Sequence, residues 1–327
     1  MMLTPPDAAV AVVHTAPAAV TVDYQRLLTL IGVNALPRRA ILVPRYARRM
    51  PFPGAGAPPW QVETIARLLL ASGVAAISAV LPDRRNDKYG YTLIAAALGI
   101  DALRRAPRLD HETLVVVLIP GRVDARNGLF GATHGLAALF HPAAAVRNTT
   151  RSIPALAQMR RLGALLLAVA DATTISDGRD AEAEYAEVRN VLLASRDPVA
   201  LDAAIAARFG LNPLQDIVWL REAHQRGLGM ADLSAIPICG DVEALRDRWG
   251  LTLPLSRRST CSTHALDDGR CENSGELAAR YRLGAFVPRL PDALRCSRLE
   301  SFLKPVQRRE DGLCQRRERV GAQRAAA

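Results

Sequence analysis

The chain has 327 residues, a formal net charge of +10 and an isoelectric point near 10.0. Hydrophobic residues make up 50% of it but aromatic residues only 5%, so its core must be aliphatic, which favours an α/β fold over an aromatic-rich β-sandwich. No uninterrupted apolar run reaches the roughly 18 residues of a membrane-spanning helix, and the N-terminus lacks the basic region of a secretory signal, so we expect a cytoplasmic protein without membrane contact.

The chain divides into three parts by composition. Prolines and an aspartate interrupt the start, and we predict a flexible N-terminal segment over residues 1–21. Residues 22–255 alternate aliphatic runs with helical patterns, which predicts one α/β domain. The strands are expected at Arg39–Pro44, Val74–Pro82, Thr113–Pro120, Ala164–Ala172, Asn190–Ser195 and Ala235–Gly240.

Helical patterns lie between these runs and carry their own boundary signals. "PPWQVETIARLLLASG" begins with prolines and ends at Gly73, and Asp241 is a candidate N-cap for a later helix. We expect helices at Trp60–Ser72, Tyr91–Arg104, Ile153–Arg161, Pro198–Phe209, Pro213–Arg226 and Val242–Trp249. This alternation predicts a mostly parallel or mixed sheet with helices on both faces, and ligands of such sheets bind beyond the carboxyl ends of the strands.

A glycine-rich segment follows the third predicted strand. "PGRVDARNGLFGATHGLAALFHP" contains four glycines and no dinucleotide or Walker A pattern. Backbone amides and guanidinium groups in such a loop can bind an anion. The candidate ligand-binding residues are Arg122, Arg126 and Asn127, with Arg45 from "RYARR" after the first strand, and His134 is a candidate base or metal ligand beside the alternative of a structural histidine.

Acidic residues follow two other predicted strands. In "NVLLASRDPVALDAAIAARFGLNP", Asp197 is expected to cap a helix that has Pro198 at its first position. Asp202 lies in the second turn, where a carboxylate facing a packed sheet needs a partner or a ligand. Asp171 is expected near the carboxyl end of a strand, and Asp177 precedes Gly178 in a turn. If these carboxylates converge, Asp171 and Asp202 are catalytic candidates, and Asp171, Asp197 and Asp202 are candidate ligands of a divalent cation.

The five cysteines, at 239, 261, 271, 296 and 314, are widely spaced and odd in number. That spacing argues against a disulfide framework, a zinc ribbon and an iron–sulfur cluster, so we expect free thiols. Residues 256–327 hold 15 arginines and lysines against 9 aspartates and glutamates, a net charge of +6, and lack an apolar period. We predict a basic, partly disordered C-terminal extension there.

The stretch from Asn190 to Asp241, "NVLLASRDPVALDAAIAARFGLNPLQDIVWLREAHQRGLGMADLSAIPICGD", resembles the signature of the prokaryotic family called domain of unknown function 362. "AVADATTISDG" and "PPWQVETIARLLLASG" fit the order of elements in that family, so the resemblance covers roughly residues 40–241. It implies an α/β domain, and because several relatives carry or accompany ferredoxin-like iron–sulfur modules, it suggests redox work with a redox partner.

Two departures from that family fall on the expected ligand rim. Val43-Pro44-Arg45 stands where relatives tend to have Lys-Pro-Asn, and "VDARNGLFGATHG" stands where they tend to have a Lys-x-His segment. These departures leave open whether the site is active, and without a cysteine cluster the iron–sulfur implication does not carry over. The leading hypothesis is an enzyme-like protein that binds a small anion or a divalent cation, without nucleic acid. The alternative is a non-catalytic binding or regulatory domain whose basic tail contacts an acidic partner or nucleic acid.

Overall fold

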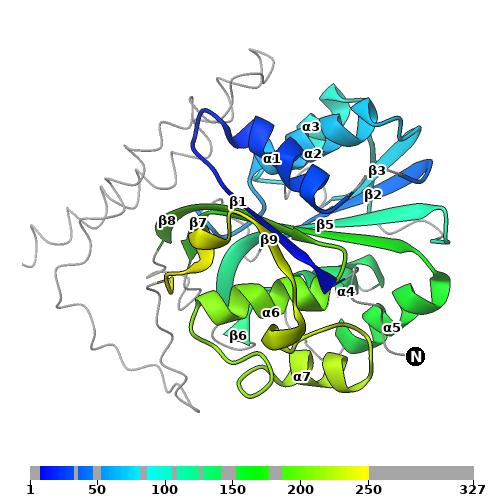
Figure 1. The fold of residues 1–327 in the computed structure, drawn as a ribbon. Coiled ribbons are helices and arrows are strands. Elements are labelled where there is room, and N and C mark those ends of the chain that lie inside the picture. Colours follow the sequence, from blue (N-terminus) through cyan, green and yellow to red (C-terminus); the bar gives the residue numbers. More distant parts are fainter. Residues whose placement is uncertain are drawn as a thin grey trace, which may run out of the picture.

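A computed structural model describes residues 8–32, 36–46, 53–81, 87–104, 109–124, 128–140, 152–176 and 186–249. They form one mixed sheet with helices on both faces (Figure 1), which confirms the predicted fold class. The strand order is β4-β3-β2-β5-β7-β8-β1-β9, and β6 pairs with β5 as a short hairpin. The strands are β1 (Val10–His14), β2 (Arg39–Pro44), β3 (Ala76–Val80), β4 (Asp101–Leu103), β5 (Thr113–Asp124), β6 (Gly128–Leu129), β7 (Leu165–Ser176), β8 (Ala186–Ser195) and β9 (Ile238–Gly240).

The helices form two layers. Figure 1 places α1 (Val20–Leu30), α2 (Pro59–Ala71) and α3 (Tyr91–Ala97) on one face of the sheet. The opposite face carries α4 (Ala132–Phe140), α5 (Ser152–Leu162), α6 (Pro198–Arg208) and α7 (Val218–Gln225). Two 3-10 turns, η4 (Leu233–Ala235) and η5 (Val242–Leu245), flank β9.

Strands β4, β3, β2, β5 and β7 are parallel, and β8 runs antiparallel to both of its neighbours, β7 and β1. Because both faces are covered, the central strands are apolar along most of their length. Alternate residues serve different cores: Val115 and Val117 of β5 belong to the core under α4 to α7, whereas Val116 and Leu118 belong to the core under α1 to α3.

The N-terminal segment differs from the prediction. Residues 10–14, within the segment expected to be flexible, form β1, which pairs with β8 on one side and β9 on the other. Helix α1 then begins at Val20. The expectation of a flexible segment over residues 1–21 is therefore wrong for this part, because the short run "VAVV" pairs with a strand on each side and buries its four side chains in the cores on the two faces of the sheet.

Two other expected helices and one expected N-cap are corrected. The helix expected over Tyr91–Arg104 ends at Ala97, because Gly99 adopts a φ of +67° just past its end, and β4 follows. The helix expected at Val242 is only the 3-10 turn η5. Asp241 does not cap that turn with its side chain; it accepts hydrogen bonds from Arg26 and from the backbone N–H of His14. Its carboxylate thus joins α1 and β1 to the end of the domain.

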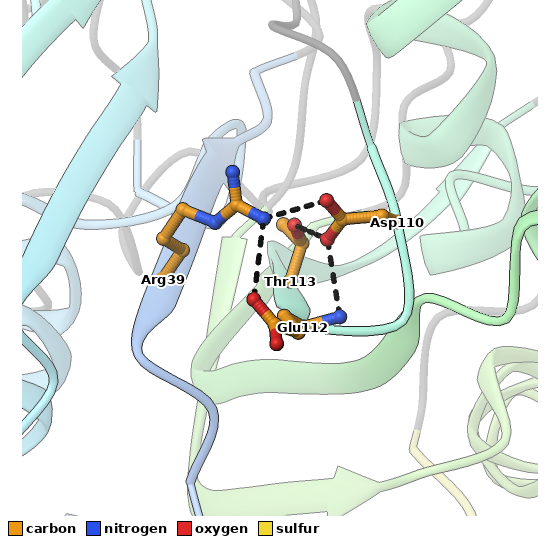
Figure 2. A network of polar contacts seen from close by, with 4 residues as sticks. All are labelled: Arg39, Asp110, Glu112 and Thr113. Carbon is orange, nitrogen blue, oxygen red and sulfur yellow. Dashed lines mark hydrogen bonds and ion pairs between the residues drawn. The ribbon is translucent and has the colours of Figure 1, made fainter.

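The two edges of the sheet differ in chemistry. At the amino ends of β2 and β5, Figure 2 shows Arg39 between Asp110 and Glu112, with Nη2 to oxygen distances of 2.6 and 3.8 Å. Thr113 also donates to Asp110, and its hydrogen bond is the largest cause that lowers the pKa of this carboxyl group. The three charged side chains are exposed, so water screens the ion pair and it adds little to stability.

At the carboxyl ends, β2 and β5 form a topological switch point. From β2 the chain passes through α2 on one face to β3, and from β5 it passes through α4 and α5 on the other face to β7. The two connections leave adjacent parallel strands in opposite directions, which is where open α/β sheets bind ligands. Arg45 directly follows β2, and its backbone N–H donates to the carbonyl oxygen of Leu118 in β5 over 2.8 Å.

Within the described residues, none of the helices combines the length and apolar character needed to cross a membrane. Cys239 has a free thiol, as expected. The other four cysteines and the whole of the predicted C-terminal extension lie outside the described residues.

Candidate functional site

Arg45 places a buried cation at the switch point. Arg45 is 7% exposed, and its Nε and Nη2 atoms have no hydrogen-bond partner among the described residues. The guanidinium carbon lies 5.7 Å from the centre of the Phe130 ring, so an aromatic face supplies part of its surroundings. Burial lowers the pKa of Arg45 to about 10, which leaves the side chain protonated at neutral pH.

His134 lies next to this cation on α4. It is 4% exposed, and neither ring nitrogen has a hydrogen-bond partner among the described residues. Its ring meets Trp219 of α7 edge-on, with centroids 4.5 Å apart. Burial, and then the positive charge of Arg45, lower the pKa of His134 to about 3. The imidazole is therefore neutral near pH 7 and can act as one donor and one acceptor, but it is a weak general base.

Glycines bring α4 close to its neighbours. A Cβ at Gly135 would overlap a methyl carbon of Val117 and would lie 3.2 Å from Cγ of Arg45. The stem of Arg45 thus runs between α4 and the sheet. The sequence predicted a ligand-facing loop here, but residues 132–140 are a helix, because the glycines allow close packing instead of opening the chain.

Asp202 of α6 holds the start of α4. Its two carboxylate oxygens accept hydrogen bonds from the backbone N–H groups of Ala132, at 2.6 Å, and Thr133, at 2.9 Å. Gly131 permits this approach, because a Cβ there would lie 2.5 Å from Oδ2 of Asp202. The side chain is fully buried, and burial raises its pKa to about 7 against the opposing effect of these hydrogen bonds. The carboxyl group is therefore close to its titration midpoint at neutral pH, and the two backbone N–H groups at the start of α4 favour its ionised form.

Asp197 is the N-cap of α6, as predicted. Its Oδ1 accepts from the backbone N–H of Val199 over 2.9 Å, and Pro198 is the first helical residue. Its Oδ2 accepts from the backbone N–H of Met230 over 2.7 Å, a contact that the sequence did not reveal. Burial raises the pKa of Asp197. The carboxylate thus fixes the segment after α7 to the start of α6.

Asp171 stabilises an irregularity in β7. The register of β7 shifts against β5 after Pro120, and against β8 between Ala172 and Thr174. Oδ1 of Asp171 accepts from the backbone N–H and the hydroxyl of Thr173, and Oδ2 accepts from Tyr24 over 2.6 Å and Trp60 over 2.9 Å. Burial raises the pKa of Asp171. Four donors from three elements make this carboxylate a structural hub.

Arg122 belongs to a different contact from Arg45. Its Nη1 donates to Oγ of Ser176 over 2.9 Å, and that hydroxyl donates to the carbonyl oxygen of Gly54 over 2.8 Å. This chain of hydrogen bonds ties the loop before α2 to the ends of β5 and β7. Arg126, Asn127 and Asp177 lie outside the described residues.

The structure brings Arg45 and His134 together but separates the acidic residues. Asp171 faces α1 and α2 through Tyr24 and Trp60, whereas Asp197 and Asp202 lie in the layer of α4 and α6. In the part of the chain that is described, no three His, Cys, Asp or Glu side chains are grouped so that they could hold a metal ion. The predicted carboxylate set for a divalent cation is not assembled, because each carboxylate binds its own local donors.

Sequence patterns did not reveal several residues that shape the site. Phe130 and Trp219 contact Arg45 and His134 from segments far along the chain, and Tyr24 and Trp60 bind Asp171. A buried arginine beside a histidine is visible only once the strand register is known. In comparisons with known proteins, no family model, no curated protein and no solved structure matches this chain. The resemblance to domain of unknown function 362 stays a prediction.

Proposed function

We propose that this protein binds a small anionic ligand at the carboxyl edge of its sheet, with the guanidinium of Arg45 as the group that holds the anion. The observation that carries the proposal is a protonated side chain, only 7% exposed, whose Nε and Nη2 atoms have no partner in the described residues. Burial of a charge without a partner is costly, so such a group calls for an anion.

The position of Arg45 supports the same conclusion. It follows β2 at the switch point, and open α/β sheets in general bind their ligands at such a point, whatever side chains they carry there. The two buried carboxylates in the layer of α4 and α6 bind other groups and not Arg45: Asp202 binds the start of α4, and Asp197 binds the backbone N–H of Met230. A divalent cation receives no comparable support among the described residues, since Arg45 would repel it.

Thermal unfolding in the presence of anions tests the proposal. Wild-type protein is compared in acetate, methanesulfonate and phosphate at constant ionic strength. A ligand at ten times its dissociation constant stabilises the folded state by about 1.4 kcal/mol, which raises the unfolding midpoint. We expect at least one of the three anions to produce such a rise, and the rise to disappear in Arg45→Gln.

Arg39→Gln is the matched control, because Arg39 begins the strand that Arg45 follows but lies exposed at the opposite edge of the sheet. It should keep the full response to the anion. If none of the three anions stabilises the wild type, or if Arg45→Gln responds as strongly as Arg39→Gln, the proposed function is wrong.

A further inference from the structure

The two unpartnered nitrogens of Arg45 lie on one edge of its guanidinium. Nε and Nη2 are the pair whose N–H bonds point in the same direction, to one side of the planar group. Two parallel donors in one plane match the two oxygens of a carboxylate, which can accept both hydrogen bonds at once. A single lysine at this position would offer charge without that geometry.

The charge around Arg45 favours a ligand with one negative charge. Its neighbours Tyr91 and His134 are neutral near pH 7, because burial raises the pKa of Tyr91 and lowers that of His134, and Arg122 is engaged with Ser176. One buried cation is balanced by a monoanion, whereas a dianion would leave one uncompensated negative charge in a dry site. Carboxylates are monoanions at neutral pH, and phosphate monoesters are largely dianions.

His134 supplies hydrogen bonds without adding charge. Both of its ring nitrogens lack partners among the described residues, so one N–H and one lone pair remain for a ligand. The edge contact with Trp219 fixes the plane of the ring. A polar atom next to the anionic group of the ligand would satisfy one of these two nitrogens.

We infer that the ligand is a monocarboxylate held side-on by Nε and Nη2 of Arg45, with the imidazole of His134 as a second hydrogen-bonding contact. This inference rests on the proposed anion site and specifies its ligand class.

The test compares three probes, each a methyl group on an anionic group of different shape and charge, by isothermal titration at pH 8.5. Acetate is a planar monoanion, methanesulfonate a tetrahedral monoanion, and methylphosphonate a tetrahedral dianion at this pH. We expect the dissociation constant of acetate to be at least about tenfold lower than that of methylphosphonate, because the second negative charge of methylphosphonate has no cation to balance it. The affinity for methanesulfonate should lie between those for acetate and methylphosphonate.

Two variants separate geometry from charge. Arg45→Lys keeps the charge but loses the two-donor edge, and we expect it to weaken acetate binding about tenfold. His134→Phe keeps a ring against Trp219 but removes both nitrogens, and we expect a loss of roughly threefold to tenfold. Circular dichroism confirms the fold of each variant, and the comparison of probes on the wild type requires no variant.

The outcomes distinguish this inference from the anion site itself. Methylphosphonate binding as tightly as acetate, or Arg45→Lys binding acetate like the wild type, would overturn the monocarboxylate inference while anion binding at Arg45 still stood. Failure of all three probes to bind the wild type would remove both.

Discussion

Replacing Asp202 with asparagine should change how stability depends on pH. In the folded protein burial raises the pKa of Asp202 to about 7, from a usual value of 3.8. Between these two values the folded state keeps a proton that the unfolded chain releases, so the contribution of Asp202 to stability is lost as pH rises from about 4 to about 7. One pKa unit corresponds to about 1.4 kcal/mol, which sets an upper limit of about 4 kcal/mol on this loss.

The pH profile of the wild type alone would hide this effect. The pKa of His134 is lowered from 6.5 to about 3, so over the same pH range its contribution to stability increases with pH. The two slopes oppose each other, and burial of Asp171 and Asp197 adds to the slope from Asp202. The useful quantity is therefore the difference between Asp202→Asn and the wild type.

Urea unfolding at pH 4, 5, 6 and 7 measures that difference. The introduced carboxamide would keep one acceptor for α4 but point an amide N–H at the other backbone donor, which gives a cost independent of pH. Relative to the wild type, the variant should gain stability steadily from pH 4 to pH 7, by up to about 4 kcal/mol. A difference that stays constant across the four pH values would refute the assignment of this titration to Asp202.

Three further substitutions test other contacts. His134→Phe removes an imidazole that is neutral in the folded protein and becomes protonated when the chain unfolds in acid. In urea unfolding, the stability of this variant relative to the wild type should therefore improve by up to about 5 kcal/mol as pH falls from 6.5 to 3. A relative stability that does not change with pH would contradict the lowered pKa of His134. Gly135→Ala should cost about 1–3 kcal/mol through overlap with Val117, and should weaken acetate binding because the stem of Arg45 must move; unchanged stability and affinity would show that α4 can shift freely. Asp171→Asn should lower the unfolding free energy by about 2–3 kcal/mol, because four donors converge on the carboxylate and asparagine turns one acceptor into a donor. The control is Asp110→Asn, at an exposed carboxylate, which should lose much less stability. Equal losses in the two variants would contradict the role of Asp171.

Local signals in the sequence were enough for several elements. Asp197-Pro198 marked the start of α6 because a cap depends only on the next two residues, and the strand at Arg39–Pro44 has the predicted bounds. The sequence did not reveal which face of β7 carries Asp171. A strand buried on both sides is apolar at almost every position, so the alternation that separates its faces is invisible until the neighbouring helices are placed.

The same limit explains the failed convergence of the acidic residues. Asp171 is expected near the end of its strand but lies within β7, which continues to Ser176, and a carboxylate on a buried strand can point into either helical layer. The glycines before and within α4 predict a loop from the sequence pattern alone, but Gly131 and Gly135 allow close contacts with Asp202 and Arg45, which lie far from them in the sequence. Such contacts depend on packing between elements and not on the residues next to them.

The position of β1 has a consequence for how the protein is made. Its two neighbours are β8, through Ser195, and β9, through Ile238, both near the end of the described domain. During synthesis this apolar strand emerges before both of its partners and stays without them until most of the domain has been translated. A nascent chain that ends before Ile238 would carry an unpaired strand edge that is open to association with other chains, so this protein should depend on chaperones on the ribosome more than a fold closed by local hairpins.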